Sequence, residues 1–256
     1  MDYDFTGKVV AVTGASGKSM GVTIARMFLE RGAKVSICSR SEERIMEAKE
    51  RISAGIEDAE NRVFAMAADL SSAEKCIQFI ESTVEHFGRI DVLINNAAVQ
   101  YKESALDTTI ESWDATMNAN ARGYFFCMQT AAKDMIRRKE PGSIINIGSG
   151  HSQMAIENRI TYAAAKAAVD QMTKSAAREW GPYGIRVNVV AAGSFPTAMS
   201  RQVLAENDFL SPQLPLRRRG KLEEIGYACL FMASEQSSYI TGTRLPVDGG
   251  YVLAIT

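Results

Sequence analysis

The sequence KVVAVTGASGKSMG, residues 8–21, decides the fold of this chain. Its first six residues are mostly apolar and β-branched, which is typical of a strand buried in a sheet. Glycine and serine follow, and then Ile24, Met27 and Phe28 share one face of an expected helix that begins at Met20. A strand, a glycine-rich turn and a helix in this order predict the first unit of a parallel sheet with helical crossovers.

The same alternation continues to the end of the chain. The later strands are short apolar runs without polar alternation, so we expect a parallel sheet buried on both faces. Right-handed crossovers would place helices on both sides of it. The sequence predicts one α/β domain over residues 1–256, a doubly wound parallel sheet of about seven strands. Its expected strands are 8–13, 34–39, 62–67, 91–95, 143–147, 184–190 and 243–247, and its helices are 20–31, one starting at Ser41, 72–87, 112–138, 160–180 and 221–233.

Composition excludes several classes of protein. The formal net charge is −1 with acids and bases mixed, so we expect no nucleic-acid partner, and the basic cluster at 217–219 is interpreted as a solvated loop rim. Residues 1–8, MDYDFTGK, do not resemble a signal peptide, and no apolar run is long enough to span a membrane, which favours a cytoplasmic protein without a membrane partner. The scattered cysteines predict no metal site and are expected to be buried thiols: Cys38, Cys76, Cys127 and Cys229.

Small or polar residues follow each expected strand, at the edge of the sheet where ligands bind in open parallel sheets. The glycine-rich loop would let the backbone approach a pyrophosphate, and the helix after it would favour the negative charge. An ordinary flexible turn is the alternative. These residues include Gly14, Ser16, Lys18, Ser19 and Gly21 after the first strand, Ser39 and Arg40, Asp69 and Leu70, Asn96 and Ala97, Ser149 and His151, and Gly193 and Thr197.

Arg40 bears on the choice of cofactor. An NAD site commonly places an acid after the second strand to hold the ribose 2′-hydroxyl, whereas this chain has an arginine there. A guanidinium attracts a 2′-phosphate and can bind it with two hydrogen bonds, and Lys18 could add a second positive charge. The pattern favours NADP over NAD. The alternative is that Arg40 is a surface arginine stacked on adenine.

Tyr162 and Lys166 lie four residues apart on an expected alanine-rich helix, so they share one helix face. A neighbouring ammonium stabilises a phenolate and would lower the pKa of Tyr162 from its usual value near 10. The tyrosine would then be a usable acid and base near neutral pH. Such a pair is usually only a surface contact, but Ser149 at a strand end upstream strengthens the catalytic interpretation.

Taken together, these motifs resemble the short-chain dehydrogenase/reductase family over residues 6–251. The resemblance implies a Rossmann fold and an NAD(P)-dependent oxidoreductase that interconverts a secondary alcohol and a ketone by hydride transfer. The matching residues are Thr13, Gly14, Asp69, Asn95, Asn96, Ala97, Ala98, Asn120, Ser149, Tyr162, Lys166, Gly193, Thr197, Asp248, Gly249 and Gly250.

The resemblance also implies roles for single residues. Tyr162 would be the general acid and base, Ser149 would hold the substrate oxygen, and Asn120 would anchor a water that links Lys166 to solvent. Lys166 would lower the pKa of Tyr162 and hold the nicotinamide ribose. The expected catalytic residues are Asn120, Ser149, Tyr162 and Lys166, and the expected cofactor-binding residues are Gly14, Ser16, Lys18, Ser19, Met20, Gly21, Ser39, Arg40, Asp69, Leu70, Asn96, Ala97, Tyr162, Lys166, Gly193 and Thr197.

The chain departs from the family pattern in three places. The first loop is longer by one residue, and Ser19 stands where a glycine is usual. Ala98 replaces a glycine, and Ala192 replaces the proline that usually precedes Gly193. The first change concerns the phosphate cradle, and the last concerns the start of an expected substrate loop around residues 193–215.

The substrate and the assembly are less constrained. Ser149, His151 and Tyr162 are the candidate substrate contacts, although His151 could equally be a solvent-facing loop residue. A catalytically silent NADP-binding sensor or scaffold and a nucleotide-sugar isomerase or dehydratase are the alternatives to an oxidoreductase. The family resemblance implies a homotetramer, built partly through the expected helix at 160–180, whose alanines could instead pack within the subunit.

Overall fold

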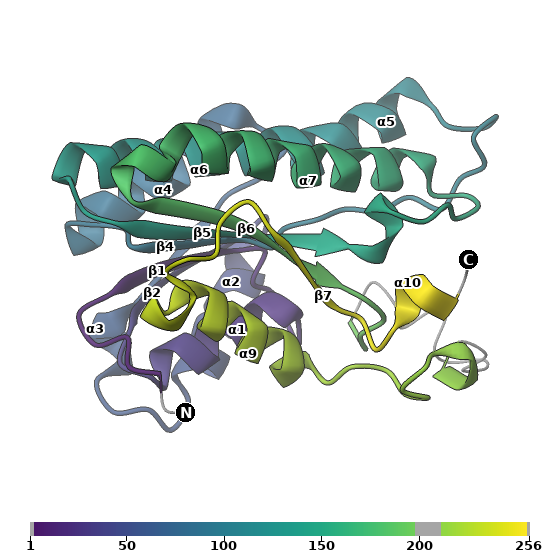
Figure 1. Cartoon of the computed structure of the whole chain (residues 1–256). Helices are drawn as coiled ribbons and strands as arrows, with labels where there is room; N and C mark the ends of the chain where they lie inside the picture. The colour runs from purple at the N-terminus through teal and green to yellow at the C-terminus, as the bar shows by residue number, and fades with distance from the viewer. Residues whose placement is uncertain (1–2, 198–210, 255–256) are drawn as a thin grey trace.

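Seven parallel strands form one sheet through the centre of the protein (Figure 1). The structure, a computed structural model, describes residues 3–197 and 211–254. The strand order β3-β2-β1-β4-β5-β6-β7 reverses direction between β1 and β4, which is the switch point of a doubly wound sheet. This confirms the predicted fold class. The strands are β1 (Val9–Thr13), β2 (Lys34–Ser39), β3 (Val63–Ala67), β4 (Val92–Asn95), β5 (Gly142–Ser149), β6 (Ile185–Ala192) and β7 (Arg244–Val247).

Helices cover both faces of the sheet, as Figure 1 shows. One layer contains α1 (Met20–Leu29), α2 (Glu42–Ser53) and α9 (Leu222–Ala233), and the other contains α4 (Ala73–Phe87), α6 (Gly123–Arg138) and α7 (Ile160–Trp180). Successive residues of β1 serve the two cores alternately, because Val10 and Val12 pack with the first layer and Ala11 packs with the second. Two short helices, α3 (Ala59–Arg62) and α10 (Tyr251–Ala254), were not predicted.

Several helix ends follow from their capping residues. The hydroxyl groups of Ser41 and Ser72 accept hydrogen bonds from the amides of Arg44 and Lys75, at 3.4 and 3.3 Å, and so begin α2 and α4. Gly88 ends α4 with a φ of 83°, in the left-handed region that glycine adopts without strain. These boundaries agree with the sequence prediction.

The single helix expected at 112–138 is wrong in detail. The chain forms α5 (Ile110–Met117), a π-helical turn at Asn118–Arg122 and then α6. At Gly123 a β-carbon would lie 2.5 Å from the carbonyl oxygen of Leu70, so only glycine lets α6 approach this loop so closely. A π-helical turn within a helix often marks a functional position, and here it contains Asn120.

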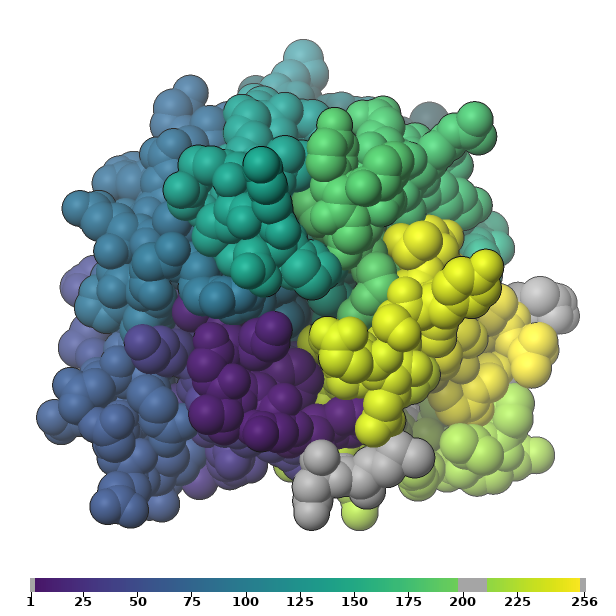
Figure 2. Space-filling model, turned by 60° about the vertical axis from the view of Figure 1, so that its left-hand side comes forward, coloured from purple at the N-terminus to yellow at the C-terminus, as the bar shows by residue number. Residues whose placement is uncertain are grey.

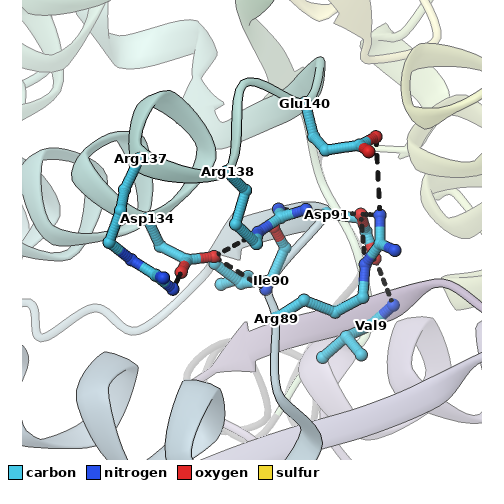
Figure 3. Close-up of polar contacts among 8 residues, drawn as sticks. All are labelled: Val9, Arg89, Ile90, Asp91, Asp134, Arg137, Arg138 and Glu140. Atoms are coloured by element: carbon cyan, nitrogen blue, oxygen red, sulfur yellow. Dashed lines mark hydrogen bonds and ion pairs between the residues drawn. The ribbon is translucent and has the colours of Figure 1, made fainter.

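Opposite charges are paired at the end of the sheet where the strands begin (Figure 3). The carboxylate of Asp91, which is 4 % exposed, accepts a hydrogen bond of 2.8 Å from the amide of Val9 and is paired with Arg89. Arg138 lies 3.8 Å from Asp91 and donates a bond of 2.8 Å to Asp134 on α6. This network joins the starts of β1 and β4 to the end of α6.

Two further features of the fold are the burial of its cysteines and the length and polarity of its helices. Cys38, Cys76, Cys127 and Cys229 are buried free thiols, as predicted. Within residues 3–197 and 211–254, no cluster of three histidine, cysteine or acidic side chains could hold a metal ion. Over the same ranges, every helix is too short or too polar to cross a bilayer.

Candidate active site

A cleft of about 920 Å³ lies at the other end of the sheet, where the strands end. Its size is at the upper end of small-molecule sites, as a dinucleotide with a substrate requires. It is lined by residues that follow six different strands. Fourteen of the predicted cofactor-binding residues line it: Gly14, Ser16, Ser19, Met20, Ser39, Arg40, Asp69, Leu70, Asn96, Ala97, Tyr162, Lys166, Gly193 and Thr197.

Lys18 and Gly21 are the two predicted cofactor-binding residues that do not line the cleft. Lys18 is exposed outside the cleft lining, so the prediction that it adds a charge toward the ligand finds no support. Gly21 lies under the loop, where a β-carbon would be 2.7 Å from the carbonyl oxygen of Gly14 and 2.8 Å from the side-chain nitrogen of Asn96. Its role is to let the loop pack onto α1.

The turns after β1 and β4 are held together by hydrogen bonds. The hydroxyl of Thr13 accepts bonds from the amides of Asn96 and Ala97, at 2.8 and 3.0 Å. The side chain of Asn96 donates to the carbonyl oxygens of Thr13 and Gly14, at 2.9 and 3.1 Å. Gly14 has a φ of 73°, and a β-carbon there would lie 2.6 Å from the α-carbon of Ala97. Only glycine therefore allows this close contact at the switch point.

Ser19 organises the lengthened loop. Its hydroxyl accepts hydrogen bonds from the amides of Ser16 and Val22, at 3.3 and 3.4 Å, so it both closes the loop and begins α1. The serine that departs from the family pattern is thus a helix cap. The N-terminus of α1 faces the cleft through Ser19 and Met20, where a phosphate group is favoured.

Arg40 and Asp69 lie at the part of the cleft formed by β2 and β3. Arg40 is exposed, and within the described part of the chain its guanidinium has no hydrogen-bond or ion-pair partner. Asp69 accepts bonds from the amide and the hydroxyl of Ser71, at 3.0 and 2.9 Å, which fix its carboxylate. Arg40 is therefore available to an anionic group of a ligand.

Lys166 is almost fully buried on the floor of the cleft. Its ammonium group donates to the hydroxyl of Tyr124 at 3.0 Å and to the carbonyl oxygen of Ile147 at 2.8 Å. Burial lowers the pKa of Lys166 to about 7, against the opposing charge of Asp170, so the lysine can change its protonation near neutral pH. The sequence did not indicate Tyr124, which comes from α6 and is 2 % exposed.

Tyr162 lines the cleft beside Ser149, but its electrostatics differ from the prediction. Burial raises the pKa of Tyr162, while a hydrogen bond with Ser149 and the charge of Arg159 act to lower it. The prediction of a lowered pKa is therefore wrong in direction, although the ammonium of Lys166, which bonds to Tyr124 and Ile147, lies 5.7 Å from the centre of the Tyr162 ring.

Asn120 lies beneath the cleft, and its side chain is fully engaged. The amide nitrogen donates to the carbonyl oxygen of Val99 and the amide oxygen accepts from the nitrogen of Val99, both at 2.8 Å. The side chain therefore fixes the segment after β4. The water-anchoring role implied for Asn120 stays a prediction.

His151 lies in the wall of the cleft, which favours the pocket interpretation over the solvent-facing one. A ring nitrogen lies 3.3 Å from the hydroxyl of Tyr251, and the ring meets that of Tyr162 edge-on with centroids 5.8 Å apart. Burial, with a contribution from the charge of Arg159, lowers the pKa of His151 to about 4. His151 is thus a neutral wall residue at physiological pH.

Residues beyond the predicted set hold Ser149 in place. Its carbonyl oxygen accepts hydrogen bonds from Arg244 at 3.0 Å and from the hydroxyl of Ser152 at 2.9 Å. The carboxylate of Asp170 lies 2.6 Å from the same hydroxyl, whose single proton is shared between the two acceptors. The network ties the end of β5 to β7 and α7, and no local pattern in the sequence indicated it.

The segment expected to form a substrate loop at 193–215 is described only in part. Residues 193–197 and 211–215 flank the cleft, and residues 198–210 lie outside the described chain. Arg219, interpreted from the sequence as part of a solvated rim, instead lines the cleft and donates to the hydroxyl of Ser194 at 3.1 Å. The interpretation was wrong for this residue because the loop folds back over β6.

Comparison with known proteins identifies the family. The family model described as enoyl-(acyl carrier protein) reductase matches residues 14–252. The chain belongs to the short-chain dehydrogenase/reductase family. This confirms the resemblance noted in the sequence, and it agrees with the position of the cleft at the switch point of the sheet.

Individual relatives are similar over nearly their whole length. A 3β-hydroxysteroid dehydrogenase from Eggerthella lenta is 35 % identical over 253 residues, covering 98 % of this chain and 95 % of the relative. A gluconate 5-dehydrogenase from Gluconobacter oxydans is 33 % identical over 256 residues, covering 99 % and 98 %. The crystal structure of a gluconate 5-dehydrogenase from Burkholderia cenocepacia, in complex with NADP and tartrate, superimposes with a TM-score of 0.90 at 32 % identity, covering 99 % and 98 %. Members with different substrates therefore share this fold.

Proposed function

We propose that this protein is an NADP-dependent oxidoreductase that interconverts a secondary alcohol and a ketone, with Tyr162 as the general acid and base. The observation that carries the proposal is the position of Ser149, Tyr162 and Lys166 together at the floor of one large cleft. The dehydrogenases among its relatives support an oxidoreductase acting on CH–OH groups.

The cleft fits a dinucleotide in three respects. Its volume is sufficient. Gly14, which packs against Ala97, carries no side chain to cover the backbone at the switch point. The start of α1 favours a phosphate. Gly14, Ser16 and Ser19 would hold the pyrophosphate, and Asp69 would lie near the adenine. The bound nicotinamide would supply the hydride donor or acceptor.

The protein's own groups would orient the substrate and move the proton. Ser149 and Tyr162 would both donate hydrogen bonds to the carbonyl oxygen, and Tyr162 would transfer its proton to that oxygen during reduction. The hydroxyl of Tyr162 is protonated at neutral pH, as an acid for carbonyl reduction must be, and the raised pKa caused by burial disfavours the phenolate that alcohol oxidation would need. Lys166, with a pKa of about 7, could return a proton toward the tyrosine.

The preference for NADP rests on Arg40. Its exposed guanidinium lines the cleft after β2, where the ribose 2′-phosphate of NADP would lie. A bidentate arginine–phosphate contact is a strong charge-assisted interaction, whereas NAD offers only a hydroxyl there. The NADP in the Burkholderia cenocepacia structure is consistent with this choice.

Equilibrium binding followed by turnover tests the proposal. The purified protein would be titrated with NADPH and with NADH while the cofactor fluorescence is followed, and then mixed with a panel of ketones and aldehydes. We expect tighter binding of NADPH and loss of its absorbance with at least one carbonyl compound. Tight binding without turnover across the panel would instead support a catalytically silent sensor or scaffold.

The assembly and location are part of the same proposal. A homotetramer formed through α7 is supported by the exposed Ala167 on this helix and by Phe125, exposed on α6. The four unpaired thiols are consistent with a reducing cytoplasm. Analytical ultracentrifugation would test the tetramer, and a monomer at micromolar concentration would contradict it.

A further inference from the structure

The substrate end of the cleft is positively charged. Beyond Ser149 and Tyr162, its walls contain two arginines, Arg159 and Arg219. Among the described residues that line the whole cleft, Asp69 is the one acid, and it lies at the opposite end after β3. Within the described chain, the charge of Arg159 is therefore not balanced by a carboxylate of the lining.

Arg159 is one of the two arginines in the walls of the substrate end of the cleft. It directly precedes α7, three residues before Tyr162. Its side chain lines the same cleft as those of Tyr162, His151 and Tyr251. Over residues 3–197 and 211–254, the Arg159 guanidinium has neither an ion-pair nor a hydrogen-bond partner. The N-terminus of α7 adds the positive end of the helix dipole at the same place.

Arg159 is more available to bind an anion than His151 and Arg219, the other two basic side chains considered for this end of the cleft. His151 is neutral at physiological pH and is engaged with the hydroxyl of Tyr251. Arg219 donates to Ser194 and forms the opposite wall. A partly buried guanidinium without a counter-ion is costly, and a ligand carboxylate or phosphate would relieve this cost with two parallel hydrogen bonds.

We propose that the substrate carries an anionic group, a carboxylate or a phosphate ester, which Arg159 binds while Ser149 and Tyr162 hold the carbonyl oxygen. This inference rests on the proposed function and names its substrate class, that of a small keto acid or keto phosphate and the corresponding hydroxy compound. Arg159 and Tyr162 line the same cleft, so one substrate can contact both side chains.

Matched substrates test this class. Steady-state kcat/KM would be measured for a series of oxo acids, their methyl esters and the corresponding keto phosphates, with wild type, Arg159→Met and Arg178→Met. Arg178 is an exposed arginine in the last turn of the same helix and serves as the control. We expect kcat/KM for the preferred anion to fall about 10- to 100-fold in Arg159→Met, mainly through KM, as loss of a charge-assisted hydrogen bond predicts.

The reactions of acids and esters, compared among the three proteins, distinguish the possible roles of Arg159. The esters should react equally well with all three proteins, and the ratio of acid to phosphate identifies which anion is bound. Equal kcat/KM for acids and esters in wild type, or an equal loss for both in Arg159→Met, would overturn the proposal. An effect shared by acid and ester would mean that Arg159 acts on Tyr162 rather than on the substrate anion.

A binding measurement keeps this inference distinguishable from the proposed function. The NADPH complex would be titrated with non-reducible carboxylates, inorganic phosphate and the matching neutral amides, while the fluorescence of the bound cofactor is followed. Anion binding that is weakened in Arg159→Met but not in Arg178→Met supports the site even if no carbonyl compound is reduced. If neither carboxylates nor phosphate bind the complex better than the amides, the proposed anion site is wrong.

Discussion

The charged side chains at the two ends of the central sheet differ in how they are paired. Where the strands begin, Arg89 and Arg138 are paired with Asp91 and Asp134, and that end is shown in Figure 3 and, as a surface, in Figure 2. Burial would raise the pKa of Asp134, but hydrogen bonds from Arg138 and Arg137 lower it below its ordinary value. The charges there stabilise one another and leave none for a ligand.

Where the strands end, two arginines of the cleft lack such partners within the described residues. Arg40 and Arg159 line the cleft without an ion pair in the described chain, and the pKa of Lys166 is lowered to about 7 because it is buried. Perturbed and unpaired charges in a cleft are typical of functional sites, whereas satisfied networks are typical of structural ones. Substitutions at the two ends should therefore affect different properties.

The largest effect is expected for Tyr162→Phe, which removes the phenol proton and keeps the ring. Turnover should fall by about 10²- to 10⁴-fold, the usual contribution of general acid catalysis, while the Kd for NADPH is unchanged. Initial rates and fluorescence titrations would measure both. Tyr227→Phe, on the exposed side of α9, is the matched control. Near-normal turnover of the Tyr162 variant would remove the assigned role.

Asp91→Asn should break the network at the other end of the sheet. The free energy of unfolding should fall by about 3 kcal/mol, since Arg89 loses its ion-pair partner and the amide of Val9 loses a charged acceptor, while the KM for NADPH stays the same. Urea denaturation would measure the change. Glu47→Gln, which disrupts an exposed pair with Arg51, should cost less than about 1 kcal/mol. Similar losses for both variants would contradict the importance of the network.

Arg40→Asp should change the cofactor preference without affecting stability. Replacing attraction for a 2′-phosphate by repulsion should shift the ratio of Kd values for NADH and NADPH toward NADH by at least about tenfold. Arg44→Asp, an exposed residue outside the cleft, is the control. If the ratio of Kd values is the same in both variants, Arg40 does not bind the 2′-phosphate of NADPH.

A pH dependence of stability is also expected to arise in the cleft wall. The pKa of His151 is about 4 in the folded protein and 6.5 for the unfolded side chain, so the unfolded state binds the extra proton between these values. Stability should fall as the pH drops from 6.5 toward 4, by at most about 1.4 kcal/mol per pH unit.

Variants of the two histidines isolate this slope. Unfolding free energies measured between pH 6.5 and 4 should depend less on pH in His151→Gln than in wild type. His86→Gln, in which the altered side chain is exposed near the end of α4, should keep the wild-type slope. An unchanged slope in His151→Gln would show that His151 is not buried as a neutral side chain.

The sequence predicted the framework because its signals are local. Apolar β-branched runs marked the strands, and Ser41, Ser72 and Gly88 marked helix ends through contacts with residues at most four positions away. The π-helical turn at 118–122 was missed, because helical spacing of the side chains continues through it.

The site was predictable where the family motif fixes the residue type. Ser149, Tyr162 and Lys166 line one cleft as expected, but Arg219 and Tyr251 reach the cleft from remote segments, and Tyr124 reaches Lys166 from α6. Lys18 is the opposite case, because it belongs to the glycine-rich loop but its side chain does not line the cleft. The helical spacing of Tyr162 and Lys166 predicted a lowered pKa for the tyrosine. Burial, which spacing does not indicate, instead raises the pKa of Tyr162 and lowers that of Lys166.

Transfer of a labelled hydride tests the central claim most directly. NADPH carrying deuterium at both C4 positions would be mixed with the protein and the carbonyl panel, and the products would be analysed by mass spectrometry. The account predicts an alcohol with one deuterium on the former carbonyl carbon, formed by wild type and hardly by Tyr162→Phe. Bound cofactor with no deuterated product from any carbonyl compound would contradict it and favour a protein that senses NADP without turnover.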